Sequence, residues 1–350
     1  MDPEDYRARA RVEAKAFEDC VEVHSLPAAF HYWSDRWIRP KLEPFGFSNP
    51  LEMFELHLAR QCARATGTAR FISIGAGNCD AELDLAARLA ERGCRDFTIE
   101  CLELNQSMLE RGRLAALARG LAGLTRFTAA DLNSWRPEGV YDAVIANQSL
   151  HHVVQLKRLF TAIRDALAAG GLFLVSDMIG RNGHRRWPET LAIVYEFWRQ
   201  TPPSYRYNLL LRRYEETFQN YDCSGRGFEG IHAQDILGLL IEQFQFQLFL
   251  PFGAAIDPFI DRAFGPHFDM ASAWDRDFID RVHQRDECEL ASGAVKPTHM
   301  LGVLTAAASG APLLHQPPLT PEFCLRVPDD RADPPPPSNP YVWGFWPHDT

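Results

Sequence analysis

The 350-residue chain is long enough to bury a large core, and its 46% hydrophobic and 23% charged residues are typical of a globular protein. Its 46 acidic and 36 basic side chains give a formal net charge of −10. This balance argues against a nucleic-acid partner, because nucleic-acid binders normally present a basic face. No apolar run reaches the roughly 18–20 residues needed to cross a bilayer, so we expect no membrane partner.

The N-terminus and the cysteines favour a cytoplasmic protein. The first twenty residues lack the apolar segment behind basic residues that marks a secretory signal. The eight cysteines are scattered and include no C-x-x-C pair, which favours reduced, buried thiols. We therefore predict no metal site.

The chain then divides by its hydrophobic pattern. Residues 1–65 read as a helical N-terminal cap, and residues 66–178 as a core in which short apolar strands alternate with helices. Several strands are apolar over successive residues, as expected when both faces of a parallel sheet are covered. The strands are expected at 69–75, 96–103, 125–130, 142–147 and 171–177.

The second half keeps this rhythm only in part. Residues 179–232 are rich in aromatic residues and arginine and read as a lid insertion. Residues 233–310 return to the core pattern, with a helix at 233–244, strands at 245–252 and 298–306, and a second insertion at 253–294. Residues 311–350 form a proline-rich tail whose terminal aromatic residues suggest docking. The cap or the tail could pair two copies into a homo-oligomer.

The stretch "SIGAGNCD" (73–80) joins the first strand to a helix. Gly75 and Gly77 let the backbone approach a ligand, and the following helix end presents N–H groups. A dinucleotide fingerprint needs a third glycine, but Cys79 stands near that place. Asp80 at the helix start would repel a pyrophosphate and could receive a cation, although it could also be a plain N-cap.

Polar side chains also follow the next strands. Glu103 ends the second strand, where a carboxylate can accept both hydroxyls of a ribose. Asp131 ends the third strand, where it can accept a hydrogen bond from an adenine amino group. The fourth strand ends in "ANQSLHHV". These positions share the carboxyl edge of the predicted sheet, where open α/β sheets bind ligands.

The chain resembles the class I S-adenosylmethionine-dependent methyltransferases of the small-molecule type. The pieces "FISIGAGNCD", "IECLELNQSMLERG", "FTAADL", "YDAVIANQSLHHV" and "LKRLFTAIRDALAAGGLFLVSDM" appear in family order over roughly 69–178. The resemblance implies a Rossmann-like, doubly wound, mostly parallel seven-stranded sheet with an antiparallel edge strand. It departs from the family where Ser73 replaces an acidic residue and Cys79 a glycine.

The resemblance also implies the cofactor and its contacts. S-adenosylmethionine would lie over the glycine loop, with S-adenosylhomocysteine as the product. The residues expected to contact it are Gly75, Ala76, Gly77, Asp80, Glu103, Leu104, Met108, Asp131, Leu132, Asn147 and Gln148.

Candidate residues for the acceptor and its chemistry follow the fourth and fifth strands. His151, His152 and His184 are candidate general bases, although packing or cofactor contact explains the first two equally well. Arg185 and Arg186 could hold an anionic group of the acceptor, or could be surface charge. The lid aromatics would shape an apolar pocket, or form the core of the lid itself. The tyrosines proposed to contact the acceptor are Tyr205, Tyr207 and Tyr214.

We therefore predict an enzyme that methylates an oxygen or nitrogen atom of a small-molecule acceptor of secondary metabolism. One alternative is a nicotinamide-dependent oxidoreductase, which the missing third glycine and Asp80 oppose. The other is an S-adenosylmethionine-binding protein that is non-catalytic, or that uses the cofactor for another displacement.

Overall fold

The computed structural model of the chain describes residues 2–18, 25–225, 227–308, 310–329 and 331–336. The aromatic end of the tail, for which docking is predicted, lies outside these residues. Among the residues described, no helix combines the length and the apolar character that a membrane span requires.

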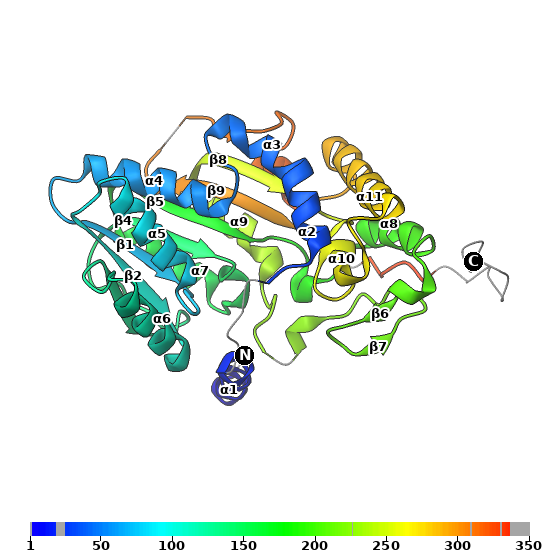
Figure 1. Cartoon of the computed structure of the whole chain (residues 1–350), viewed down its shortest axis with the longest axis horizontal. Helices are drawn as coiled ribbons and strands as arrows, with labels where there is room; N and C mark the ends of the chain where they lie inside the picture. Colours follow the sequence, from blue (N-terminus) through cyan, green and yellow to red (C-terminus); the bar gives the residue numbers. More distant parts are fainter. Residues whose placement is uncertain (1, 19–24, 226, 309, 330, 337–350) are drawn as a thin grey trace.

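One eight-stranded sheet, in the order β10-β8-β9-β5-β4-β1-β2-β3, forms the centre of the molecule (Figure 1). Strands β1 to β5 all run parallel to one another. Strand β9 lies between β5 and β8 and runs antiparallel to both. The bounds are β1 Ala69–Ile74, β2 Phe97–Glu103, β3 Thr125–Ala129, β4 Tyr141–Asn147, β5 Leu167–Met178, β8 Gln245–Phe252, β9 His299–Thr305 and β10 Leu313–Leu314.

This sheet confirms the predicted mostly parallel, doubly wound α/β fold, with two differences of detail. The antiparallel strand β9 lies inside the sheet, and all but its first residue are buried, as suits a strand with a partner on each side. The short β10 adds an eighth strand beside β8. In addition, β5 begins at Leu167, because this residue already pairs with Tyr141 before a register shift.

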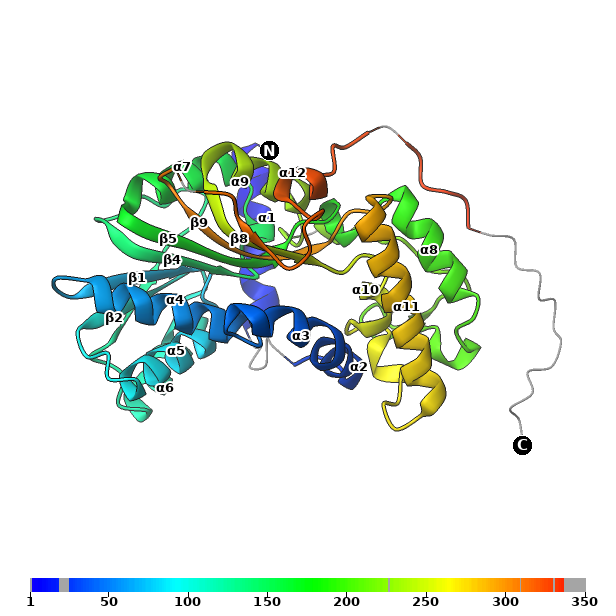
Figure 2. The same ribbon diagram turned by 90° about the horizontal axis from the view of Figure 1, so that it is seen from above.

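Helices cover both faces of the sheet, as Figure 2 shows. Helices α4, α5 and α6 lie on one face, and α7, α9 and α12 on the other. The apolar stripe predicted on α7 is buried, including Leu159, Phe160 and Ile163. The bounds are α4 Pro50–Arg64, α5 Asp80–Glu91, α6 Gln106–Ala118, α7 Leu156–Ala166, α9 Ala233–Gln243 and α12 Pro321–Cys324.

The two insertions form a second lobe beside the sheet (Figures 1 and 2). Aromatic side chains build its centre, where Trp198 contacts Phe259 and Phe264 edge-on or tilted, and Phe278 packs against Phe259. Most lid aromatics are therefore core residues of this lobe. Its elements, with the short helices that adjoin it, are α2 Ala28–Trp33, α3 Arg39–Leu42, α8 Pro188–Trp198, β6 Tyr207–Asn208, β7 Arg213–Tyr214, α10 Asp257–Ile260 and α11 Ala273–Ser292.

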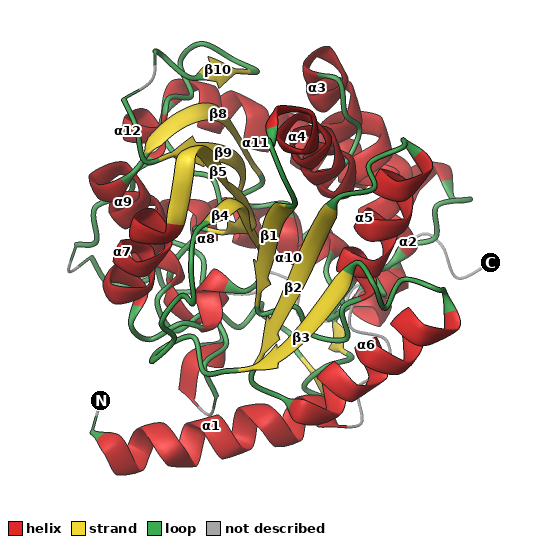
Figure 3. Cartoon of the chain, turned by 90° about the vertical axis from the view of Figure 1, so that its left-hand side faces the viewer, coloured by secondary structure: helices red, strands yellow, loops and turns green. Residues whose placement is uncertain are grey.

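The first helix, α1 Pro3–Glu18, runs across the carboxyl end of the sheet (Figure 3). Its Tyr6 bonds to Asp131 behind β3, and its Glu13 bonds to His152 behind β4. The N-terminal cap thus covers the edge at which the predicted site residues gather.

The missing third glycine of the loop is replaced by a glycine on a neighbouring helix. Cys79 precedes α5 in the left-handed conformation, with φ 63°, and its side chain is fully buried. Gly112 on α6 makes room for it, because a Cβ added there would lie 2.8 Å from Cys79 Sγ and 2.9 Å from its Cβ. The loop before α5 and helix α6 can therefore pack closely, with the required glycine in α6 instead of in the loop.

We expect Gly112→Ala to lower the free energy of unfolding by about 1–2 kcal/mol. Alanine normally favours a helix over glycine by about 0.5–1 kcal/mol, but overpacking against Cys79 costs about 1–3 kcal/mol. Urea denaturation measures the difference. Gly123→Ala is the control, since no atom lies within 4 Å of its added Cβ. Equal stability of Gly112→Ala and the wild type would contradict this packing argument.

Candidate functional site

A cavity of about 160 Å³ opens at the carboxyl edge of the sheet, beneath α1. It lies where the glycine loop after β1 meets the ends of β2, β3 and β4. The residues that line it are Glu13, Gly75, Gly77, Glu103, Leu104, Asn105, Met108, Asp131, Leu132, Asn133, Gln148, Ser149, His152, Val153 and Phe228.

The glycine loop passes very close to the turn that follows β4. Gly75 has φ 70° and Gly77 has φ 56°, values that glycine adopts without strain. A Cβ added at Gly75 would lie only 2.6 Å from Ser149 Cβ, whereas one at Gly77 would meet only the flexible end of Met108 at 3.4 Å. Gly75 is therefore required twice, by its backbone conformation and by the lack of space.

Glu103 joins the glycine loop to the start of α6. Its carboxylate accepts hydrogen bonds from Gly77 N at 3.0 Å, Leu104 N at 2.8 Å and Asn105 N at 3.0 Å. Asn105 in turn caps α6 by accepting from the backbone N–H groups of Ser107 and Met108. One carboxylate thus fixes the loop and the helix end on the cavity wall.

Helix α1 supplies two residues that sequence reasoning missed. Tyr6 OH donates to Asp131 Oδ2 at 2.7 Å, and its ring stacks on Phe228 at 5.3 Å. Burial, and then the carboxylate of Asp131, raise the pKa of Tyr6 well above its usual range. Glu13 accepts from the Nδ1–H of His152 at 2.6 Å and from Phe228 N at 3.0 Å. These contacts draw α1 over the cavity.

Asp177, near the end of β5, fixes the turn after β4 that carries the two adjacent histidines. This fully buried carboxylate accepts from Ser149 N, Leu150 N and Met178 N at 2.8–2.9 Å, and from His151 Nδ1 at 2.6 Å. Burial by itself would raise the pKa of Asp177, but His151 and the backbone N–H groups hold it below its usual range.

Glu229, in the loop before α9, brings the three predicted histidines together. His184 Nε2 hydrogen-bonds to Glu229 Oε1, and the Nε2 atoms of His151 and His152 lie 3.5 and 3.6 Å from its two oxygens. Burial would lower the pKa of His151, but the Asp177 and Glu229 carboxylates raise it to about 10. In His184, burial dominates and the pKa is lowered. Sequence reasoning missed Glu229 because it lies far from the histidines along the chain.

The structure gathers most of the predicted cofactor residues at the cavity, although contact with a cofactor stays a prediction. Within the described part of the chain, three of them do not line it, namely Ala76, Asn147 and Asp80, the last of which is exposed at the start of α5. Contact of Asp80 with a cofactor stays a prediction, while Glu103 accepts the N–H of Gly77 in the loop. The predicted residues that line it are Gly75, Gly77, Glu103, Leu104, Met108, Asp131, Leu132 and Gln148.

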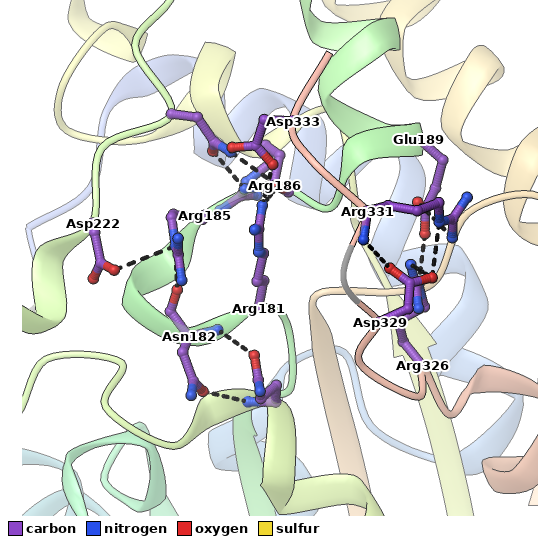
Figure 4. Close-up of polar contacts among 12 residues, drawn as sticks. Arg181, Asn182, Arg185, Arg186, Glu189, Asp222, Arg326, Asp329, Arg331 and Asp333 are labelled. Atoms are coloured by element: carbon purple, nitrogen blue, oxygen red, sulfur yellow. Dashed lines mark hydrogen bonds and ion pairs between the residues drawn. The ribbon is translucent and has the colours of Figure 1, made fainter.

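The two predicted acceptor arginines are engaged elsewhere. Arg186 is buried and makes an ion pair with Asp257, and also donates to Ala254 O at 3.2 Å and His184 O at 2.6 Å. Arg185 donates to Asn182 O at 3.2 Å and lies 3.4 Å from Asp222 (Figure 4). Both prefer these partners because a buried or half-buried guanidinium needs its donors satisfied.

The three predicted acceptor tyrosines also lie away from the cavity. Tyr207 and Tyr214 pair across the β6–β7 hairpin and are 41% and 53% exposed. Tyr205 packs edge-on against Phe268 and donates to Asp275 at 3.3 Å. Their contact with an acceptor stays a prediction, because the hairpin belongs to the second lobe.

The chain matches the model of a protein family described as "Methyltransferase domain" over residues 72–173. This range contains the glycine loop, Glu103, Asp131 and the paired histidines. Residues 72–173 form a methyltransferase domain. No curated protein matches the sequence.

Several solved structures are similar to the chain that carries this methyltransferase domain. The O-methyltransferase from a trans-AT PKS multienzyme of Brevibacillus brevis, in complex with S-adenosyl-L-homocysteine, is 16% identical over 83% of this chain and 82% of its own, with TM-score 0.41. Geranyl diphosphate methyltransferase in complex with GPP and sinefungin is 11% identical over 85% and 99%, with TM-score 0.45. The [4+2]-cyclase SpnF is 18% identical over 72% and 80%, with TM-score 0.40.

In the methyltransferase domain, a buried acidic side chain lies beside Ser73, the residue at which the sequence differs from the family pattern. Ser73 Oγ donates to Glu82 Oε1 at 2.6 Å, while Glu82 Oε2 has no hydrogen-bond partner among the described residues. Burial raises the pKa of Glu82 to about 7, although the Ser73 hydrogen bond opposes the rise. A buried acid from α5 thus lies directly against the side chain of Ser73 in β1.

We expect Glu82→Gln to reduce the loss of stability at higher pH. Because the carboxyl binds a proton on folding, its contribution is present below about pH 4.5 and is lost as pH rises through 7, by about 3 kcal/mol at most. Urea denaturation at pH 5, 6.5 and 8 should show a shallower fall for this variant. Glu91→Gln, at the exposed end of the same helix, should keep the wild-type slope. An unchanged slope in Glu82→Gln would argue against a protonated Glu82.

Proposed function

We propose that this protein is an S-adenosylmethionine-dependent methyltransferase that methylates an oxygen or nitrogen atom of a small-molecule acceptor. The observation that carries the proposal is the cavity within the methyltransferase domain, walled by the glycine loop, Glu103 and Asp131. Open α/β sheets bind ligands at this edge.

The chemistry of the wall fits the cofactor. The carboxylate of Glu103 keeps acceptor capacity for a ribose hydroxyl beside its three backbone hydrogen bonds, and Asp131 offers an acceptor to an adenine amino group. Leu104, Met108 and Leu132 give apolar surface for a flat ring between them. A nicotinamide-dependent oxidoreductase would bind a pyrophosphate against the glycine loop. Here the N–H of Gly77 already donates to the Glu103 carboxylate, whose negative charge would repel a pyrophosphate.

When bound, S-adenosylmethionine supplies a methyl group on a sulfonium, which is already a good electrophile. The protein then has mainly to align the acceptor and exclude water. His152 is the predicted catalytic histidine that lines the cavity, and the lid adds Phe228 beside it. We propose that the acceptor binds at this end of the cavity, in place of the tyrosines that the sequence suggested. The division into cap, core, lid, late core and tail stays a prediction, as does pairing into a homo-oligomer.

Binding of the cofactor should be weakened when Glu103 loses its charge. Glu103→Gln keeps the shape of the side chain but replaces one acceptor oxygen, which the ribose hydroxyls would need, with an NH₂ group. We expect this to cost about 1–3 kcal/mol, or roughly 5- to 150-fold in affinity. Calorimetric titration of S-adenosylhomocysteine into both proteins measures this change. Glu110→Gln is the control, because Glu110 is exposed on α6 and pairs with Arg113.

Three results of this titration would separate the alternatives. A wild type that ignores S-adenosylhomocysteine but binds a nicotinamide cofactor would favour the oxidoreductase. Binding that does not depend on Glu103 would remove the residue on which the site is built. Tight binding without transfer of a radiolabelled methyl group to any acceptor in a broad panel would favour a non-catalytic binder or another displacement.

The cavity volume suggests that α1 moves when the cofactor binds. Its volume of about 160 Å³ is below the roughly 300–1,000 Å³ usual for ligand pockets. Tyr6 OH donates a hydrogen bond to Asp131, the carboxylate that is proposed to accept one from the adenine amino group. Binding would therefore break the Tyr6–Asp131 hydrogen bond, and part of the interaction energy would offset that loss.

We expect Tyr6→Phe to bind S-adenosylhomocysteine more tightly, by about 2- to 12-fold, since a net hydrogen bond contributes about 0.5–1.5 kcal/mol. The same calorimetric titration measures it. Tyr32→Phe is the matched control, because Tyr32 OH also bonds to an aspartate, Asp280, but away from the cavity. Weaker binding by Tyr6→Phe would mean that α1 stays closed over the cofactor and contacts it.

A further inference from the structure

Three loops carry four metal-ligating side chains to one point beside the cavity. His151 and His152 lie in the 3₁₀ turn after β4, His184 follows β5, and Glu229 precedes α9. Backbone hydrogen bonds tie these loops together, from Ile231 N to His151 O at 3.0 Å and from Gly183 N to Gly230 O at 2.8 Å. The side chains therefore meet on a fixed frame.

The distances suit ligands of one shared ion better than direct hydrogen bonds. Nε2 of His151 and Nε2 of His152 lie 3.5 and 3.6 Å from the two oxygens of Glu229. Two ligand atoms about 2.0–2.1 Å from a tetrahedral ion lie about 3.4 Å from each other. One ligand atom from each of His151, His152 and Glu229 lies within 4.8 Å of the other two.

Both adjacent histidines are held by a carboxylate on the opposite ring nitrogen. His151 donates through Nδ1 to Asp177, and His152 donates through Nδ1 to Glu13, each at 2.6 Å. With Nδ1 held in this way, Nε2 of each ring faces the Glu229 carboxylate. This carboxylate–histidine arrangement is the one that orients imidazole ligands of metals.

The charges also call for a cation. Glu13, Asp177 and Glu229 bring three carboxylates, and within the described residues every ion-pair partner of these three is a histidine. The three carboxylates gather around two adjacent imidazoles, and binding of a metal ion would displace the proton that His151 otherwise shares with Asp177 and Glu229. A divalent ion would supply positive charge at the point where the Nε2 atoms converge.

We propose that His151, His152 and Glu229 bind one divalent transition-metal ion, and that His184 positions Glu229 through its hydrogen bond. Two imidazoles and one carboxylate suit Zn²⁺ or Fe²⁺ and leave coordination positions open. His152 also lines the cavity, so an open position faces it. Resting on the proposed function, this ion would bind the hydroxyl oxygen of the acceptor and lower the pKa of that hydroxyl, whose proton would pass to solvent water. The oxygen would then take the methyl group as the methyl–sulfur bond breaks, with no histidine base required.

The test begins with untagged protein purified without chelators, whose metal content is measured by plasma mass spectrometry. Chelator-stripped protein is then titrated with Zn²⁺, Mn²⁺, Co²⁺ and, without oxygen, Fe²⁺. We expect about one equivalent to bind, the melting temperature to rise, and Co²⁺ to give visible absorption bands of a nitrogen- and oxygen-ligated ion.

Variants then locate the ion. Glu229→Gln and His152→Gln should abolish the Co²⁺ bands and the thermal shift, and Glu13→Gln should weaken binding by about 10- to 100-fold because it only orients a ligand. Glu229 is 41% exposed at its side chain, so its substitution should leave the fold intact, which circular dichroism checks. His267→Gln is the control, because His267 bonds to Tyr207 O in the second lobe.

Weak binding that is equal in the wild type and Glu229→Gln would overturn the proposal. The cluster would then be a network of protonated histidines and carboxylates. Titration of S-adenosylhomocysteine into the metal-free protein separates this failure from a failure of the proposed function, since the cofactor wall shares only His152 and Glu13 with the metal cluster.

Discussion

The carboxylate of Asp177 is the constraint on which the site depends. It lies fully buried near the end of β5 and takes four donors, three from backbone N–H groups and one from His151. A buried carboxylate stays charged only when such donors replace its water. The turn after β4 must therefore wrap around Asp177. This wrapping brings Ser149 against Gly75 and aims the outer ring nitrogen of His151 at Glu229.

The glycine loop illustrates how the same packing problem can be solved with other residues. The family pattern has an acidic residue in the first strand and a glycine near Cys79, and this chain has neither. Glu82 reaches Ser73 from α5, and Gly112 on α6 vacates the space that the Cys79 side chain fills. The requirements of the fold, an acid under the loop and a close approach of helix to loop, are met from the neighbouring helices.

The sheet and the residues at its carboxyl edge could be predicted because periodicity and strand ends are local signals. Glu103 and Asp131 end parallel strands, so they meet at one edge whatever the rest of the chain does. Tyr6, Glu13 and Glu229 reach the cavity only through the docking of α1 and of the lid loop, which no local pattern encodes. The ion pair of Arg186 with Asp257 likewise depends on the packing of the two insertions, because Asp257 lies in the other insertion. Tyr207 and Tyr214 lie in the second lobe, where aromatic side chains pack around Trp198, and no local pattern in the sequence encodes this placement.

Helix α1 links the two ends of the site. Tyr6 and Glu13 are seven residues apart, so they point from one face of the helix, one to Asp131 and the other to His152. If the cofactor displaces Tyr6 as proposed and α1 moves as one rigid helix, Glu13 would also leave His152, and a partner that fixes His152 would favour the closed helix. Coupling of this kind is reciprocal, because each event changes the free energy of the same helix position. Through α1, binding of the proposed cofactor would therefore be coupled to binding of the proposed metal ion, although the two ligands need not touch each other.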